Sequence, residues 1–549
     1  MSKRRLTWPV ALFLVLELAV GALIWFHNSP AAAQTQTSAT TGSAATAAPD
    51  APKVDKQTAP PELDQFGCPK PPKKVPKPGE KAKTLADDLI PIGILILVIT
   101  VVVWRLPKVE LGHSVAFKTR RLMNWLPLGL TYSLLYFARY NIKQYQGVGL
   151  SEAQYGTVFG VGAFVYGIAF LLNGPLTDRW GGRATILIAA AGAGAANLLL
   201  GYMAVSGTTF GMTPTAAFAV VFAINMYFQS FGAVSIVKVN ASWFHMRERG
   251  TFAGIFGILI SLGLYFAFDI GPRIKEALPI QWVFWIPAII LLVFFVLSFI
   301  FVRNNPSDAG HADFDLGDAT SAEKLTVVQV FKKLLTHPVI LTISAIELCS
   351  GFLRQAILQW GPDFAKGVGQ DKTFVFTNWG MVSCLAGILG GMFAGAISDH
   401  VFQSRRSPVS GVLYGLMLTG AIMIVFMMKT PAAIGWVVAL MSMAIIGVHG
   451  MLTATASADF AGKANTGVAV GIIDGFVYLG STVQSFLYGA MLPASKIEDA
   501  HGCMVKNDAA THIENWKVWP YAMIPIALIG FLLTLRIWNA RPTRNTPAH

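Results

Sequence analysis

Apolar stretches of about 20 residues recur along the chain and are separated by shorter polar segments. Each stretch is long enough to cross roughly 30 Å of hydrocarbon as an α-helix, because a helix rises about 1.5 Å per residue. The runs are continuous and do not alternate with polar residues, which excludes a transmembrane β-barrel. The pattern predicts an all-α polytopic membrane protein.

The first apolar stretch stands apart from the others at the N-terminus. It runs from Trp8 to Phe26, follows Lys3-Arg4-Arg5 and precedes Ala31-Ala32-Ala33. A basic segment, an apolar core and a small-residue site are typical of a secretory signal peptide. The stretch is also long enough for a retained anchor, so residues 1–33 are predicted to be a signal peptide or a signal anchor.

A polar linker and one extra helix come next. Residues 34–86 are rich in Ala, Thr, Pro and Lys and cannot bury enough apolar surface to offset the entropy of ordering, which predicts a disordered linker. Residues 87–121 contain a second apolar stretch, near 89–104, and a basic connector. We expect an extra transmembrane helix here.

Twelve further apolar stretches follow, and the polar segment 303–337 divides them into six and six. The first six form a half at 122–302 and the second six form a half at 338–538, with a tail at 539–549. Their approximate bounds are 122–142, 152–176, 184–205, 214–241, 251–271, 280–302, 338–365, 373–398, 409–428, 432–458, 466–491 and 516–538.

The two halves carry similar landmarks at nearly equal offsets. Arg139 in the first span and Arg354 in the seventh lie 215 residues apart, and Asp178 and Asp399, after the second and eighth spans, lie 221 apart. Such internal similarity is typical of transporters built from two repeats around a central site. The sequence therefore predicts two parallel six-helix halves.

Charge sets the expected orientation. The chain has 42 Lys and Arg against 29 Asp and Glu, but charged residues are only 13% of the total. Most arginines fall in short loops on one side of the twelve spans, which predicts that this side is cytoplasmic and the linker periplasmic, in a bacterial inner membrane. No basic stripe lies on a soluble domain, so nucleic acid is not expected as a partner.

Two arginines lie within apolar spans, where each costs on the order of 2.5–3.5 kcal/mol on insertion scales unless it faces a cavity or a partner. Repeat symmetry places Arg139 and Arg354 opposite each other between the halves. Two planar, permanently charged forks suit a phosphate group, which accepts bidentate hydrogen bonds. In the alternative interpretation Arg139 snorkels to the interface and Arg354 pairs with Glu347.

Other polar residues in the spans are candidates for binding and coupling. Tyr136 and Tyr166 are placed to donate to a substrate, and Lys238 either binds substrate or snorkels near a helix end. Glu347 and Asp474 lie deeper, where each either carries a proton, neutralises an arginine or packs as a polar group.

The loops after the second and eighth spans predict a conformational latch. Asp178, Arg179 and Arg183 occupy the first loop, and Asp399 and Arg405 occupy the second. An aspartate there can cap a helix N-terminus while the arginines bridge to acidic groups, which holds one face in a single state.

Four cysteines show no metal-ligand spacing, and no metal or cofactor is expected. Cys68 and Cys503 fall on the same predicted outer side, where an oxidising compartment permits a disulfide; the alternative is that they stay unpaired. Cys349 and Cys384 fall within spans and are expected to be apolar fillers. No nucleotide-binding or catalytic motif occurs, so the protein is not expected to be an enzyme.

The segment Gly174-Pro175-Leu176-Thr177-Asp178-Arg179-Trp180-Gly181-Gly182-Arg183 resembles the signature loop of the major facilitator superfamily. The span arginines, with Trp243-Phe244 and Arg247-Glu248-Arg249-Gly250, resemble the organophosphate:phosphate antiporter family. The resemblance covers about 122–540. It implies a twelve-helix major facilitator fold in which Arg139 and Arg354 bind phosphate, with Tyr136 nearby.

The chain also departs from the glycerol-3-phosphate carriers of that family. Ile260 stands where they have a fifth-span histidine, and Phe170 where they have a second-span lysine. Glu347 adds an acid near the expected phosphate site. These differences make the site less positive.

The function expected from the sequence is secondary transport of a small phosphorylated organic anion, of the glycerol-3-phosphate or sugar-phosphate class, in exchange for phosphate. The partners are this anion and the lipid bilayer, and the carrier is expected to be a monomer. Two alternatives stay open. One is a proton-coupled organic-anion symporter in which Glu347 or Asp474 titrates, and the other is a transporter-like sensor of sugar phosphate.

Overall fold

The computed structural model describes residues 85–105, 111–245, 248–315, 329, 332, 335–402, 406–456, 466–498 and 504–539. Several expectations fall outside this set. They are the signal or anchor segment, the linker, Arg405, the side chain of Asp399, and the pairing of Cys68 with Cys503.

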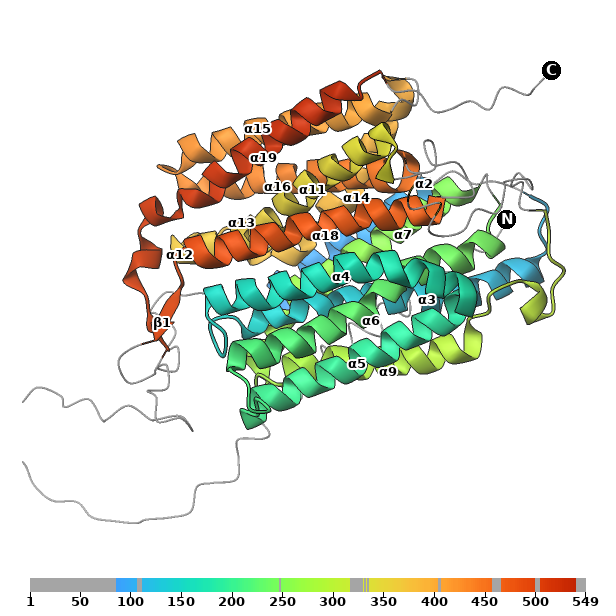
Figure 1. Cartoon of the computed structure of the whole chain (residues 1–549), viewed down its shortest axis with the longest axis horizontal. Coiled ribbons are helices and arrows are strands. Elements are labelled where there is room, and N and C mark those ends of the chain that lie inside the picture. Colours follow the sequence, from blue (N-terminus) through green and yellow to red (C-terminus); the bar gives the residue numbers. More distant parts are fainter. Residues whose placement is uncertain are drawn as a thin grey trace, which may run out of the picture.

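The described residues are mostly helical, and the chain forms two groups of helices that lie side by side (Figure 1). The extra helix that the sequence predicts is α2 (Leu85–Arg105), and it packs against α14. The first half consists of α3 (Val115–Tyr140), α4 (Glu152–Trp180), α5 (Gly182–Ser206), α6 (Pro214–Trp243), α7 (Arg249–Tyr265), the π-helix η4 (Phe266–Ile270), α8 (Gly271–Ala277) and α9 (Trp282–Phe301).

The second half is also a bundle of α-helices that includes one π-helix. It consists of α11 (Pro338–Leu358), α12 (Trp360–Gly367), α13 (Phe374–Thr377), α14 (Trp379–His400), α15 (Arg406–Met427), α16 (Ile434–His449), the π-helix η7 (Gly450–Ala456), α18 (Thr466–Met491) and α19 (Val518–Arg536). A small antiparallel hairpin of β1 (Lys496–Glu498) and β2 (Met504–Lys506) lies between α18 and α19, with Ile497 opposite Val505.

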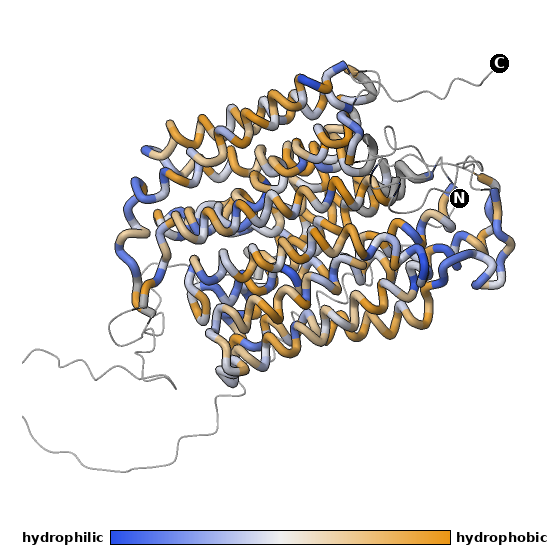
Figure 2. The backbone as a smooth tube through the Cα atoms, viewed as in Figure 1, coloured by the Kyte–Doolittle hydropathy of each residue, from blue (hydrophilic) through white to orange (hydrophobic). Residues whose placement is uncertain are grey.

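Ten helical segments among the described residues are long and apolar enough to cross a membrane, and Ile90–Trp104 and Trp379–Gly395 are shorter apolar helices. Hydrophobic residues predominate along the helices, and hydrophilic residues gather toward the two ends of the bundle (Figure 2). The membrane character predicted from the sequence is therefore present in the structure.

Local capping explains where several helices begin. Ser114 accepts a hydrogen bond from the Phe117 amide at the start of α3, and Thr213 accepts one from the Ala216 amide at the start of α6. At the start of α4, Ser151 and Gln154 form a reciprocal capping box. Each cap satisfies an amide that has no partner within its own helix, which fixes the beginning of the span.

The successive helices run in alternating directions, which gives the bundle two distinct ends. We call the end that carries Arg121, Arg179, Arg183, Arg303 and Arg406 the basic end. We call the other end, which carries η2 (Asn141–Tyr145), α12 and the β hairpin, the opposite end.

The most extensive contacts between the halves are those of α4 with α18 and of α7 with α14. Glycines allow α4 and α18 to touch through their backbones. A Cβ on Gly156 would lie 2.6 Å from the Ser485 carbonyl oxygen, and one on Gly167 would lie 3.0 Å from the Gly475 carbonyl oxygen. Small residues of this kind let membrane helices approach closely. We call this contact the glycine seam.

A candidate anion-binding site between the halves

Arg139 lies in the last turn of α3 and is fully buried. Its Nε donates to the Gln229 side-chain oxygen at 2.9 Å, and one terminal nitrogen donates to the Tyr478 hydroxyl. The guanidinium carbon lies 4.5 Å and 4.4 Å from the ring centres of Tyr136 and Tyr166. The other terminal nitrogen has no hydrogen-bond partner. All four neighbours are neutral, and they come from four helices of both halves.

Arg354 is the corresponding arginine on α11, and it is 6% exposed. Its Nε is buried without a hydrogen-bond partner. The side chain borders a small cavity together with Ser383 and Ser442, which add hydroxyl groups to an otherwise apolar lining. Tyr136 interacts electrostatically with both arginines, so the two cations share one neighbourhood between the halves.

Within the part of the chain that the structure describes, no carboxylate forms an ion pair with either arginine. A buried charge is costly unless it is paired and hydrogen-bonded. Two such cations with free donors therefore form a site that is complementary to an anion. This geometry differs from the alternative in which Glu347 neutralises Arg354.

Glu347 instead faces a histidine. Its Oε2 lies 3.2 Å from Nδ1 of His449, the last residue of α16, and Nε2 of the same ring lies 4.0 Å from Oδ1 of Asp474 on α18. Thr453 of η7 also lies within hydrogen-bond distance of His449 Nδ1, at 3.1 Å. The structure brings together the two acids that the sequence suggests for coupling, and it adds His449 between them.

Lys238 lies away from the arginines, near the basic end. Its ammonium pairs with Asp178 at 2.6 Å, and the side chains are 45% and 63% exposed. Arg183 donates to the Phe299 carbonyl oxygen at 2.8 Å, and Arg179 is exposed. Among the described residues, the contacts of Asp178 and Arg183 stay within the first half.

Three carboxylates, those of Asp363, Asp269 and Glu152, make polar links between the halves at the opposite end. Lys143 pairs with Asp363 at 2.6 Å, and burial lowers the pKa of Lys143 while Asp363 acts against that shift. The Asp269 carboxylate accepts hydrogen bonds from two amides at the start of α14, Gly380 at 2.7 Å and Met381 at 2.8 Å. The third link is Glu152 Oε1, which accepts from the Ser495 amide at 2.9 Å. Together they close this end.

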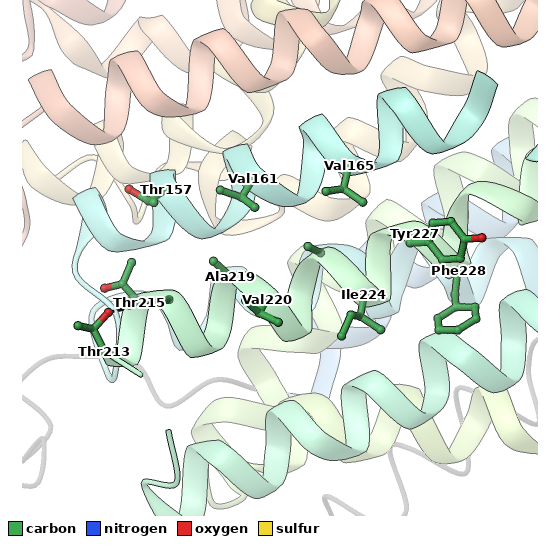
Figure 3. Close-up of a pocket in the computed structure, with 12 residues that line it drawn as sticks. Thr157, Val161, Val165, Thr213, Thr215, Ala219, Val220, Ile224, Tyr227 and Phe228 are labelled. Atoms are coloured by element: carbon green, nitrogen blue, oxygen red, sulfur yellow. Dashed lines mark hydrogen bonds between the residues drawn. The ribbon is translucent and has the colours of Figure 1, made fainter. Parts of the chain in front are cut away.

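A groove of about 840 Å³ lies between α4 and α6, outside the anion site (Figure 3). Val161 and Val165 of α4 and Val220 and Ile224 of α6 line it, and its surface is almost entirely apolar. An anion would lose its hydration there without gaining partners. The groove is therefore separate from the binding chemistry of the arginines.

Sequence reasoning did not identify Gln229, Tyr478 or His449. Each is a single polar or aromatic residue within an apolar span, and its role depends on which side chain of a distant helix it meets. For His449 a signal existed, since an ionisable residue inside a span is a candidate functional group by default.

A helical bundle that spans the membrane and holds a charged site between two similar halves is the architecture of a secondary transporter. The family model for the Major Facilitator Superfamily matches residues 122–485, which is more than half of the chain, and the chain belongs to this superfamily. The resemblance seen in the signature loop is thereby confirmed.

Two relatives of known or assigned role are similar to this chain over most of their length. The chain is 26% identical over 390 residues to the glycerol-3-phosphate transporter of Bacillus subtilis (strain 168), covering 67% of this chain and 85% of that protein. It is 24% identical over 452 residues to the membrane sensor protein UhpC of Salmonella typhimurium, covering 77% and 92%.

Among solved structures, the fold is similar to that of a bacterial homologue of the human lysosomal transporter Spinster. The TM-score is 0.60 at 13% identity, with 79% of this chain and 100% of that chain covered. At this identity the similarity concerns the fold alone. It agrees with the helical transporter architecture described above.

Proposed function

We propose that the protein transports a small phosphorylated organic anion across the inner membrane, in exchange for phosphate, by alternating access. The observation that carries this proposal is the pair of buried arginines, which have unpaired guanidinium nitrogens and no carboxylate partner among the residues that the structure describes. An anion that enters between them supplies the missing charge and accepts the free hydrogen bonds.

The chemistry of the site favours a phosphate group over a simple carboxylate. A phosphate monoester carries about −1.5 to −2 charges near neutral pH and offers three acceptor oxygens. The unpaired nitrogens of the two guanidinium groups can donate to those oxygens. Relatives named as a glycerol-3-phosphate transporter and probable hexose phosphate transport proteins support the same substrate class.

The proposal includes a membrane orientation and a helix count. The basic end faces the cytoplasm, in keeping with the excess of arginine on that side. Twelve membrane crossings form the two halves, and α2 adds one more beside α14. The links at the opposite end then close the carrier toward the periplasm, so substrate exchanges with the cytoplasmic side.

Exchange in proteoliposomes tests the proposal. Purified protein is reconstituted with phosphate inside the vesicles, and uptake of radiolabelled glycerol 3-phosphate and glucose 6-phosphate is measured. We expect uptake only when phosphate is present inside the vesicles. An exchanger returns its binding site to the outer face only with an anion bound, and phosphate is that anion here. Uptake of neither compound, together with no binding of phosphate compounds to the purified protein, would contradict the proposal.

A second candidate is a sensor that binds a phosphorylated sugar without moving it. The similarity to a membrane sensor protein over 77% of this chain supports it. The same buried arginines would then bind a signal molecule. Binding of hexose phosphate with measurable affinity, combined with no uptake or exchange in proteoliposomes, would favour the sensor.

A further inference from the structure

A second cluster of ionisable groups lies close to the arginines but is not part of the anion site. Glu347 of α11, His449 of α16 and Asp474 of α18 stand in a row, with the imidazole between the two carboxylates. We call this row the acid–histidine centre. It differs from the arginine site because its members face one another across three helices of the second half.

The row runs from accessible to buried space. The side chain of His449 is 26% exposed, that of Asp474 is 14% exposed, and that of Glu347 is fully buried. Two carboxylate oxygens, Oε1 of Glu347 and Oδ1 of Asp474, are buried without a hydrogen-bond partner. An unpaired buried carboxylate oxygen is costly, and a bound proton removes part of that cost.

The backbone at this point is also unusual. His449 is the last residue of α16, and η7, a π-helix, begins at the next residue. π-Helical segments are rare and occur often at functional sites. Here the wider turn brings Thr453, one turn further along, to the same imidazole nitrogen as Glu347.

The centre is electrostatically joined to the anion site through Arg354, whose charge acts on both His449 and Asp474. In the empty protein the negative charges of the two carboxylates partly balance the positive charges of the arginines. A bound anion neutralises the arginines itself and makes the electrostatic potential at the carboxylates more negative. Negative potential favours the protonated form of any nearby acid or imidazole. Other titratable groups facing the centre are Tyr136, Tyr166, Cys349 and Tyr414.

We infer that Glu347, His449 and Asp474 form a proton-binding centre that takes up a proton when an anion binds at Arg139 and Arg354. His449 receives the proton from water and passes it to a carboxylate. Because linkage is reciprocal, the bound proton also strengthens binding of the anion. This role rests on the proposed function, and it makes the proton a second ligand of the same carrier.

Isothermal titration calorimetry measures the proton directly. Glycerol 3-phosphate is added to purified protein at about pH 8, where a phosphate monoester with a second pKa near 6 is already a dianion. Repeating the titration in two buffers of different ionisation enthalpy gives the number of protons taken up per anion. We expect close to one for the parent, and less than half of that for Glu347→Gln or Asp474→Asn.

Ser344→Ala is the matched control, because Ser344 is buried on the same helix three residues from Glu347 and its hydroxyl has no hydrogen-bond partner. It should take up as many protons as the parent. Binding of the anion without proton uptake in the parent would overturn the inference, and so would equal uptake in the parent and in both amide variants. In either case the proposed transport function would stand.

Infrared spectroscopy of the empty protein separates the two proposals further. A pH difference spectrum of the parent should contain a protonated-carboxyl band that disappears in Glu347→Gln or in Asp474→Asn. If no phosphate compound binds, the proposed function fails while this band still reports on the centre. A spectrum without such a band, or one unchanged in both variants, would overturn the proton centre by itself.

Discussion

The neighbours of Arg139 determine what the site can bind. An amide, two aromatic faces and a hydroxyl hold the guanidinium in place, but none of them carries a negative charge. The protein thus fixes the orientation of the cation and leaves its charge for a ligand. Such preorganisation favours a planar, bidentate acceptor over a monodentate one.

Replacing either arginine by lysine tests this geometry. A lysine keeps the charge but loses the planar fork, and hydrogen bonds to charged groups contribute about 1.5–3 kcal/mol each, so affinity should fall roughly 10- to 100-fold. Binding of glycerol 3-phosphate to Arg139→Lys and Arg354→Lys is measured by calorimetry. Arg183→Lys, which lies at the basic end, should bind like the parent. Parent-like affinity in Arg354→Lys would contradict a bidentate site.

Removing the hydroxyl of Tyr478 should change stability in a ligand-dependent way. In Tyr478→Phe, Arg139 loses its hydroxyl acceptor, and a buried unsatisfied donor costs about 1–3 kcal/mol. We expect a lower melting temperature without ligand and a larger rise on adding phosphate, because the anion replaces the lost acceptor. Thermal unfolding with and without phosphate measures both. An equal phosphate shift in parent and variant would contradict this role.

How far the site could be predicted from sequence depends on the kind of residue. Arg139 and Arg354 can be identified from the sequence, because a permanent charge in an apolar span has a high free-energy cost and is therefore a candidate functional group. Tyr478 and Gln229 cannot, because aromatic and amide side chains also occur in spans as ordinary packing groups. Their identity as partners of Arg139 depends on how α18 and α6 pack, which no local pattern encodes.

At the scale of helices, the sequence patterns predict the spans and the repeat but do not identify the glycine seam. Continuous apolar runs predict each span, and the offset of 215 residues between the two arginines predicts the repeat. The π-helices η4 and η7 leave no such signal. They lie inside the predicted spans 251–271 and 432–458, so the sequence predicts ordinary helix there.

A single methyl group in the glycine seam should act as a wedge between the halves. Overpacking costs about 1–3 kcal/mol, so Gly156→Ala should shift the equilibrium away from the conformation closed at the opposite end by roughly 5- to 100-fold. Gly174→Ala is the matched control, because it lies on the same helix and its Cβ would meet nothing within 4 Å.

Distance measurements report the wedge. Spin labels at Met212 and Lys429, which are exposed in different halves at the opposite end, give the separation by electron paramagnetic resonance. Gly156→Ala should move the distribution to longer distances and lower the exchange rate, while Gly174→Ala should change neither. An unchanged distribution in Gly156→Ala would show that the seam tolerates a side chain.

At the scale of the whole molecule, the binding groups all come from α3 to α18, and the segments before α3 add none among the described residues. We therefore expect a chain that lacks residues 1–84 to bind glycerol 3-phosphate within about twofold of the parent, a difference below 1 kcal/mol. Calorimetry on the truncated protein in detergent measures this. A tenfold loss of affinity would show that the N-terminal region contributes to the site.

The links at the opposite end should also control how transport responds to temperature. In the proposed transport cycle, the Lys143–Asp363 pair, the two amide bonds to Asp269 and the Glu152 contact break and form again, and all of them are polar. Opening of such a gate is often slower than the chemistry or binding that it admits. The Arrhenius slope of exchange should then include the enthalpy of breaking these bonds, and a variant with weaker links should show a shallower slope than the parent.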